Sequence, residues 1–188
     1  MVNFSLRPSF ISSLVLVLLL FVVFSHATKV VEVPVICNQT ENPPFCTNFL
    51  NSIPGGATGK DLVSIAQYTI DVVRENITNS IKLIKSLISQ NASDPKKKKH
   101  YQLCLDIFEE TARDDLEETQ ESLKMRNYFD LNTAAGAIAF SVDLCITNAS
   151  MTPGDPPYQD SSLLPKYADV IEKVIDITLV ISNILLEK

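Results

Sequence analysis

The chain contains four cysteines, and their number and spacing bear on several kinds of chemistry. Eight residues lie between Cys37 and Cys46, and forty lie between Cys104 and Cys145. Neither spacing is that of a zinc-binding knuckle, whereas an even number of cysteines in a small secreted chain is typical of a disulfide framework. A Cys37–Cys46 bridge would close a short N-terminal loop, and a Cys104–Cys145 bridge would join two helices. We therefore expect neither a metal site nor a cofactor.

Groups suited to acid–base or nucleophilic catalysis are scarce. His100 is the one histidine outside the N-terminal segment described below, and it directly follows the run Lys96-Lys97-Lys98-Lys99. This basic surrounding makes His100 a poor general base, so no Ser-His-Asp or Cys-His arrangement can be assembled around it. Carboxylates are plentiful, but nothing in the sequence distinguishes one with a raised pKa. We predict that the protein is not an enzyme.

Charged side chains instead suggest two binding surfaces. Acidic residues recur at spacings of four, four, three and four, which places them on one face of a helix; they are Asp106, Glu110, Asp114, Glu117 and Glu121. This face would contact either a basic protein partner or water. The lysine run at 96–99 could bind a polyanion such as a de-esterified cell-wall polysaccharide, or could be a solvated helix start. Asp115, at the edge of the apolar face, is expected to make a buried hydrogen bond.

The N-terminal segment Met1–Ala27 has the features of a secretory signal peptide. Arg7 supplies its positive charge, the segment from Phe10 to Phe24 is apolar, and Ser25-His26-Ala27 fits a cleavage site. The apolar segment is short for a membrane span, so an uncleaved anchor is the less favoured alternative. Four acceptor sequences for N-glycosylation support secretion; they begin at Asn38, Asn76, Asn91 and Asn148, of which Asn76 falls in the middle of a predicted helix.

The rest of the chain is predicted to be helical and to form one domain, residues 28–188. Apolar residues at three- and four-residue spacing predict long helices over 60–90, 100–126, 131–148 and 163–186. Residues 28–59 are predicted to be irregular because of their prolines, with a short helical turn at Thr47–Ser52. Long helices joined by short connections favour an all-α antiparallel four-helix bundle. The net charge of −6 argues against nucleic acid and anionic membranes as partners.

Several of these features together resemble the plant invertase/pectin methylesterase inhibitor family. The resemblance covers essentially the whole chain after the signal segment. It is carried by the four cysteines, by Thr40 and Pro44 between the first two, by the run Cys104-Leu105-Asp106-Ile107-Phe108-Glu109-Glu110-Thr111-Ala112-Arg113-Asp114-Asp115-Leu116, by Tyr128-Phe129-Asp130, by the alanine-rich helix that ends at Cys145 and by the closing stretch Leu179–Leu186.

The resemblance implies a fold and a mode of action. The fold would be a four-helix bundle with an N-terminal helical hairpin, and the disulfides would be Cys37–Cys46 and Cys104–Cys145. Members of the family are not enzymes; they bind and block a carbohydrate-active enzyme. The location would be extracellular, in the apoplast or cell wall, with the vacuole as the alternative and no membrane attachment after signal removal.

Two classes of target are implied, and one short segment bears on the choice. Invertase inhibitors insert a Pro-Lys-Phe segment that precedes the third bundle helix, whereas pectin methylesterase inhibitors cover the substrate cleft with a helical face. Here the corresponding segment is Asn127-Tyr128-Phe129, and Pro165-Lys166-Tyr167 lies in the wrong place. We therefore predict a pectin methylesterase inhibitor, with an acid invertase inhibitor as the alternative and a helical signalling or storage protein as a further one. The candidate partner contacts are Asp106, Glu110, Asp114, Glu117, Tyr128 and Phe129.

Overall fold

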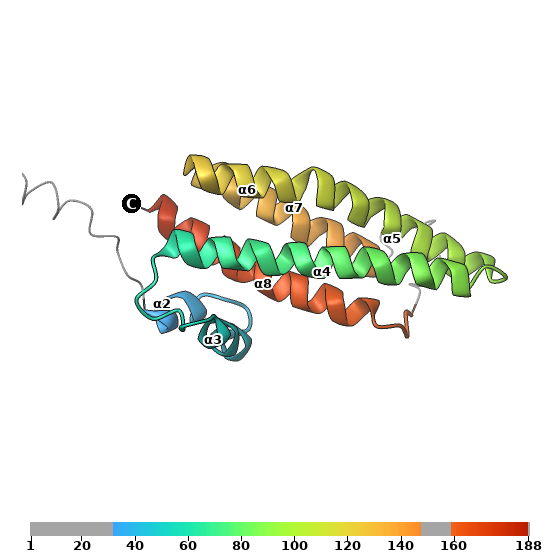
Figure 1. Cartoon of the computed structure of the whole chain (residues 1–188), viewed down its shortest axis with the longest axis horizontal. Helices are drawn as coiled ribbons and strands as arrows, with labels where there is room; N and C mark the ends of the chain where they lie inside the picture. The colour runs from blue at the N-terminus through green and yellow to red at the C-terminus, as the bar shows by residue number, and fades with distance from the viewer. Residues whose placement is uncertain (1–31, 148–158, 188) are drawn as a thin grey trace, which may run out of the picture.

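A computed structural model describes residues 32–147 and 159–187, so the signal segment and Asn148 lie outside the described residues. The chain forms the helices α2 (Val33–Cys37), α3 (Pro43–Ser52), α4 (Leu62–Gln90), α5 (Pro95–Arg113), α6 (Asp115–Met125), α7 (Tyr128–Thr147) and α8 (Leu164–Leu186). Figure 1 shows α4, the consecutive pair α5 and α6, α7, and α8 as an antiparallel bundle. The predicted all-α four-helix bundle is therefore confirmed.

Helix α4 illustrates how the sequence determines the bundle. Asp61 caps its first turn by accepting a hydrogen bond from the Ser64 amide at 3.0 Å. One face then carries apolar side chains that are completely buried, among them Ile65, Ile77 and Ile84. This face packs against α8 and α5, because burying it removes a long apolar stripe from water.

Polar side chains inside the bundle fix which helices meet. The Thr178 hydroxyl of α8 donates to the Thr69 hydroxyl of α4 at 2.8 Å, and both residues are fully buried. Gln67 of α4 and Gln120 of α6 exchange two amide hydrogen bonds of 2.9 and 2.7 Å. Satisfied polar pairs of this kind cost little in the core and disfavour other helix registers.

The predicted helix over 100–126 is wrong in two respects. It starts earlier, at Pro95, because the Asp94 side chain accepts from the amides of Lys96 and Lys97 and caps the first turn. It is also interrupted at Asp114, which separates α5 from α6. Aspartate competes with the backbone for hydrogen bonds in helix interiors. Backbone hydrogen bonds still run from Asp114 to Glu110 and from Glu118 to Asp114, so α6 continues α5 rather than turning back.

The third bundle helix also begins earlier than predicted, at Tyr128 instead of residue 131. Arg126 adopts a left-handed conformation with φ of 57° and ends α6. The Asn127 side chain then accepts from the Asp130 amide at 3.3 Å and starts α7. Tyr128 and Phe129 therefore belong to the first turn of a helix and not to a preceding loop.

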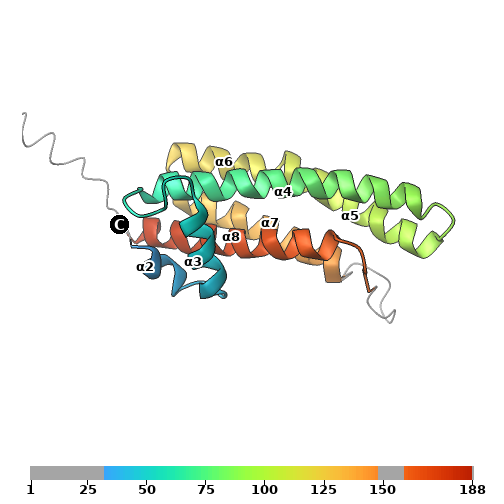
Figure 2. The ribbon, with the colours of Figure 1, turned by 60° about the horizontal axis from the view of Figure 1, so that its bottom comes forward.

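The described part of the N-terminal region, from residue 32 on, contains two helices where mostly irregular structure was predicted for residues 28–59, and the predicted helical turn at Thr47–Ser52 lies within α3. Its prolines start helices rather than break them, since Pro34 lies in the first turn of α2 and Pro43 opens α3. A disulfide joins Cys37 at the end of α2 to Cys46 in α3, with Cα atoms 5.3 Å apart. This hairpin packs on α8 at one end of the bundle, as Figures 1 and 2 show. The N-terminal hairpin implied by the family resemblance is therefore present.

Candidate protein-binding surfaces

The predicted acidic face exists and follows α5 and α6 across their junction. We call it the acidic stripe; its members Asp106, Glu110, Asp114, Glu117 and Glu121 are all exposed. The junction at Asp114 leaves them on consecutive turns because the backbone hydrogen bonds continue through it. Carboxylates that are fully in water retain their hydration, so a basic partner could pair with them at modest desolvation cost.

Cations from two elements lie beside the acidic stripe. Arg74 of α4 pairs with Glu117 at 2.8 Å, and the Arg113 guanidinium contacts both carboxylate oxygens of Asp114 at 3.0 and 3.1 Å. The hydrogen bond from Arg113, and then its charge, lower the pKa of Asp114 despite a small opposing effect of burial. Asp114 and Glu117 are thus partly neutralised, while the Asp106 carboxylate accepts only from the neutral amide of Gln102 among the interactions of described residues.

Asp115 differs from the acidic stripe because its side chain is half-buried. Burial raises its pKa, and the nearby charges of Glu110, Asp114 and Glu118 raise it further. A hydrogen bond to Thr111, which is buried, acts in the opposite direction. The Asp115 carboxylate is thus only partly covered and lies near Thr111, while its predicted buried hydrogen bond stays a prediction.

The two aromatic residues among the predicted contacts occupy different environments. Tyr128 packs partly against the core, whereas the Phe129 side chain is 66% exposed in the first turn of α7. An exposed phenylalanine at a helix start could enter a partner's pocket. Phe129 lies in α7, just after the end of α6, whereas the acidic stripe follows α5 and α6. The two features therefore lie on adjoining elements.

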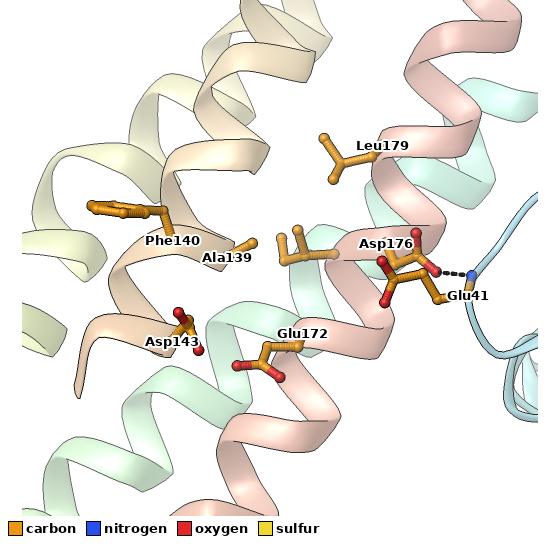
Figure 3. Close-up of a pocket in the computed structure, with 8 residues that line it drawn as sticks. Glu41, Ala139, Phe140, Asp143, Glu172, Asp176 and Leu179 are labelled. Atoms are coloured by element: carbon orange, nitrogen blue, oxygen red, sulfur yellow. Dashed lines mark hydrogen bonds between the residues drawn. The ribbon is translucent and has the colours of Figure 1, made fainter. Parts of the chain in front are cut away.

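A second acidic surface was not predicted from the sequence. Four carboxylate residues, Glu41, Asp143, Glu172 and Asp176, line a groove of about 400 Å³ whose apolar lining is Ala139, Phe140, Ile175 and Leu179. We call it the acidic groove. Figure 3 shows Asp143 of α7 facing Glu172 of α8, with Glu41 of the hairpin beside Asp176. The Glu41 amide donates to the Asp176 carboxylate at 2.8 Å, and this bond joins the hairpin to the bundle.

The carboxylates of the acidic groove repel one another. Burial raises the pKa of Glu172, and the charges of Asp143, Asp169 and Glu41 raise it further, while Lys173 lowers it. Burial also raises the pKa of Asp176. Lys173 is engaged with Asp169 at 2.7 Å. Among the described residues none of the four groove carboxylates has an ion pair, so the negative charge of this surface is not compensated within the described structure.

Helix α7 carries two exposed phenylalanines, one in its first turn and one at the acidic groove. Phe129 and Phe140 are eleven positions apart, which is close to three helical turns, and Phe140 is 67% exposed. Among the described helices α7 is the one long and apolar enough to cross a membrane by length and composition, a test that bundle helices also pass. Three of its side chains, Leu131, Ile138 and Val142, are fixed in the bundle core. One feature of the sequence indicates these exposed apolar side chains: apolar residues occur on more sides of α7 than a single core can cover.

His100 is buried in a structural cluster. Its Nε2 atom lies 3.8 Å from Asp160, whose carboxylate also accepts from the Tyr101 hydroxyl at 2.8 Å and the Ser162 amide at 2.8 Å. Burial raises the pKa of Asp160, but the nearby His100 and the hydrogen bonds from Ser162 and Tyr101 lower it to about 2. The Ser162 hydroxyl donates to this carboxylate and not to the imidazole. The three groups are thus arranged to hold the start of α8 against α5 rather than to activate a nucleophile.

The second disulfide lies beside this cluster. Cys104 of α5 and Cys145 of α7 are bonded, with Cα atoms 4.9 Å apart, and Cys104 Sγ is 3.9 Å from His100 Nε2. Among residues 32–147 and 159–187 no group of three or more His, Cys, Asp or Glu side chains is placed to hold a metal ion. The cysteines therefore have a covalent structural role.

The lysine run lies in the first turns of α5, where Lys96, Lys98 and Lys99 are exposed and Lys97 is half-buried. Lys98 and Lys99 line a shallow groove together with Pro95, Gln102, Leu103 and Asp106. Asp106 places a negative charge in this groove, which weakens it as a polyanion site.

Comparison with known proteins identifies the architecture. Residues 32–181 match the family described as plant invertase/pectin methylesterase inhibitor. The chain belongs to this family. The matched region falls within the predicted domain 28–188 and includes both disulfides, the acidic stripe and the acidic groove. The family is one of protein inhibitors, so the prediction that the chain is not an enzyme is confirmed.

Relatives and solved structures agree with this membership. The chain is 33% identical over 150 residues to a pectinesterase inhibitor of Actinidia deliciosa, covering 80% of this chain and 77% of that protein. It is 31% identical over 177 residues to pectinesterase inhibitor 1 of Arabidopsis thaliana, covering 94% of each. The crystal structure of a mutant form of an Arabidopsis pectin methylesterase inhibitor superposes with a TM-score of 0.68 at 29% identity, covering 81% of this chain and 97% of that one.

Proposed function

We propose that this protein inhibits pectin methylesterase by binding over its substrate cleft without undergoing any reaction itself. The observation that carries the proposal is the similarity, over most of the chain, to proteins that are themselves pectinesterase inhibitors. The Arabidopsis pectinesterase inhibitor 2, 26% identical over 157 residues, adds a third such relative. The alternative of a signalling or storage protein without an enzyme target has no support among these relatives.

The acidic stripe is the surface that we assign to the target enzyme. Its carboxylates are exposed along two consecutive helices, which provides a long, rigid face rather than a mobile loop. Such a face suits the covering of an elongated cleft, and its charge would attract a partner with basic residues around that cleft. Asp106, Glu110, Asp114 and Glu117 are the proposed electrostatic contacts, and Phe129 with Tyr128 the proposed apolar ones.

Inhibition of acid invertase is the second candidate because Phe129 is exposed where the family resemblance expects the phenylalanine of a Pro-Lys-Phe segment. The two preceding positions are Asn127 and Tyr128, however, and neither supplies the positive charge of the missing lysine. Asn127 instead caps α7. The loss of this cation disfavours binding in an acidic glycosidase site.

We further propose that the protein is secreted into the apoplast after cleavage behind Ala27 and carries N-linked glycans. The acceptor asparagines are Asn38, Asn76, Asn91 and Asn148. Asn38 is exposed at the end of α2 beside the disulfide residue Cys37, and Asn91 ends α4, where its side-chain amide donates to the Leu87 carbonyl at 2.8 Å. The lysine run at 96–99 would add a weak contact with cell-wall polyanions.

The test is an inhibition assay with the secreted, purified protein. A panel of pectin methylesterases and acid invertases is assayed between about pH 5 and pH 7, with inhibitor heated and reduced as the inactive control. We expect inhibition of at least one pectin methylesterase and of no invertase. Inhibition of invertase alone would reverse the assignment, and inhibition of neither enzyme class would remove it.

A further inference from the structure

Two sequence features that inhibition does not use meet on one face of the bundle. One is the glycosylation sequence Asn76-Ile77-Thr78 in α4, and the other is Pro165-Lys166-Tyr167 in the first turn of α8. Asn76 lines a groove of about 260 Å³ together with Leu163, Lys166, Tyr167 and Val170. Figure 2 shows α4 and α8 side by side along this face.

The groove has the chemistry of a carbohydrate-packing surface. Leu163 is 54% exposed, and Tyr167 and Val170 are half-buried beside it, so the lining is mainly apolar. A pyranose ring has a face of C–H bonds that packs well on an aromatic ring. The exposed Lys166 ammonium at the rim can donate hydrogen bonds to sugar hydroxyl and acetamide oxygens. A single sugar anchored at Asn76 would thus meet an apolar floor and a polar rim.

We propose that Asn76 carries an N-linked glycan whose first N-acetylglucosamine packs in this groove against Tyr167 and Leu163. The inference rests on the secretory part of the proposed function, because the sugar donor is an oligosaccharide joined to a lipid diphosphate in the secretory pathway. In the transfer, the bond between the anomeric carbon and the diphosphate oxygen breaks and a bond from that carbon to Asn76 Nδ2 forms. The displaced amide proton leaves with the lipid diphosphate.

The geometry around Asn76 is compatible with an attached sugar. The residue is half-buried on α4, and its Nδ2 atom donates to the Val72 carbonyl at 2.8 Å. An amide nitrogen has two hydrogens, so this bond uses one and leaves the other position for the sugar. Thr78, the third residue of the acceptor sequence, is exposed and donates its hydroxyl to the Arg74 carbonyl at 2.8 Å. The helical position of Asn76 therefore does not exclude it.

The glycan would leave the acidic stripe uncovered. Arg74 pairs with Glu117 and so faces α6. Asn76 is two residues after Arg74, and side chains two residues apart on a helix point in directions that differ by about 200°. Asn76 accordingly lies on the α8 side of α4. The sugar would cover an exposed apolar patch on the face of the bundle that is not assigned to the target enzyme.

The first experiment tests attachment. The chain is secreted with its other acceptors removed by Asn38→Gln, Asn91→Gln and Asn148→Gln, and the mass of the product is measured. We expect one glycan. Thr78→Val, which has the same shape but no hydroxyl, should abolish it, and Thr78→Ser should retain it. A secreted product without sugar at Asn76 overturns the proposal.

The second experiment tests packing. An endoglycosidase that leaves one N-acetylglucosamine on Asn76 is applied, and thermal unfolding is compared with that of the Thr78→Val chain. We expect the single sugar to raise Tm by about 2–4 °C. The same comparison in a Tyr167→Ala background should show no difference, because the packing surface is gone. A gain that is absent in the native background, or that persists unchanged with Tyr167→Ala, overturns the proposed packing.

Failure of this inference is distinguishable from failure of the proposed function. The Thr78→Val and Thr78→Ser chains are both assayed against the pectin methylesterase panel, and we expect equal inhibition from the two. Equal inhibition with no glycan at Asn76 overturns the further inference and removes Asn76 from the proposed glycan acceptors, but leaves the proposed target enzyme intact. A glycan at Asn76 without inhibition of any panel enzyme sinks only the proposed target.

Discussion

The acidic stripe and the acidic groove both concentrate carboxylates, but they do so in opposite surroundings. The stripe lies on one continuous pair of helices, in water, with Arg74 and Arg113 beside it. The groove assembles exposed carboxylates from the hairpin and α7 with half-buried ones from α8, and none of them has an ion pair among the described residues. The pKa of Asp114 is consequently lowered, whereas those of Glu172 and Asp176 are raised.

This difference separates two roles that a negative charge can have. Exposed carboxylates lose little hydration when they meet a basic partner, so the stripe can attract an enzyme without weakening the fold. Crowded, half-buried carboxylates cost free energy whenever all of them are ionised. We therefore expect the groove to make the attachment of the hairpin depend on pH, and the stripe to serve the proposed contact with a partner.

The largest expected effect concerns Asp160, a buried carboxylate that accepts hydrogen bonds from neighbouring donors. Asp160→Asn should destabilise the protein by about 2 kcal/mol, because the hydrogen bonds from Tyr101 and Ser162 lose a charged acceptor and His100 loses a nearby carboxylate. The folded pKa of about 2 lies below the unfolded value. Wild type should thus lose this stability as the pH falls from about 4 to 2, and the variant should not.

Urea unfolding between pH 2 and pH 6 measures this effect. Asp169→Asn, which removes an exposed i,i+4 partner of Lys173, is the control and should change stability little. Equal stability losses for the two variants would contradict the special position of Asp160.

The next effect concerns binding. Replacing Asp106, Glu110 and Asp114 by serine should weaken inhibition of pectin methylesterase by about tenfold or more, most strongly at low ionic strength. The inhibition constant is measured at two salt concentrations. Asp143→Asn with Glu172→Gln, which reduces the charge of the acidic groove, should leave inhibition intact. If the groove variant loses inhibition and the stripe variant does not, the two surfaces have been assigned the wrong way round.

A smaller effect concerns pH and the acidic groove. The pKa values of Glu172 and Asp176 are higher in the folded state than in the unfolded state. At a pH between the unfolded and the folded pKa of each residue, the folded state therefore binds more protons. Stability should therefore rise as the pH falls from neutral into this window. Asp143→Asn with Glu172→Gln should stabilise the protein at pH 7 by about 1 kcal/mol or less and flatten this rise.

Hydrogen exchange of the hairpin amides, measured at pH 5 and pH 7, reports this change in stability. The change should be greatest in the hairpin because Glu41 lines the acidic groove. Glu75→Gln with Glu121→Gln removes the same formal charge from exposed helix positions and serves as the matched control. An equally flat pH profile in the control would assign the effect to net charge alone.

The smallest effect is expected at the edge of the acidic stripe. Arg74→Met should cost about 0.5 kcal/mol, because the Arg74–Glu117 pair is solvent-exposed and screened by salt. Thermal unfolding at low and high salt measures it, and the difference from wild type should nearly vanish at high salt. A loss of several kcal/mol would show that the pair holds α4 to α6 and is not a surface contact.

The bundle itself could be predicted because each long helix repeats its apolar residues at helical spacing over many turns. Local chemistry caused the errors. Pro34 and Pro43 predict breaks in helical structure, but they stand at helix starts, where proline is tolerated. Asp114 interrupts a periodic pattern that continues on both sides of it. Asn127 extends α7 by a capping hydrogen bond that apolar periodicity cannot report.

The candidate sites were predictable to the extent that they are local in sequence. The acidic stripe lies within sixteen consecutive positions of one helical stretch, so its spacing reveals it. Glu41, Asp143 and Glu172 are far apart in the sequence and become neighbours only when the hairpin, α7 and α8 pack together. The partial burial of Glu172 and its repulsion by Glu41 and Asp143 likewise arise from tertiary structure.

The Cys104–Cys145 disulfide has a consequence for how the protein responds to proteolysis. It encloses the tight turn between α6 and α7, where Arg126 is exposed in a left-handed conformation and offers a cleavage site to proteases that cut after basic residues. A nick after Arg126 would give two fragments that stay covalently joined, with α5 and α7 still paired across the bundle. In electrophoresis, a cleaved molecule would therefore migrate as one species until the disulfide is reduced.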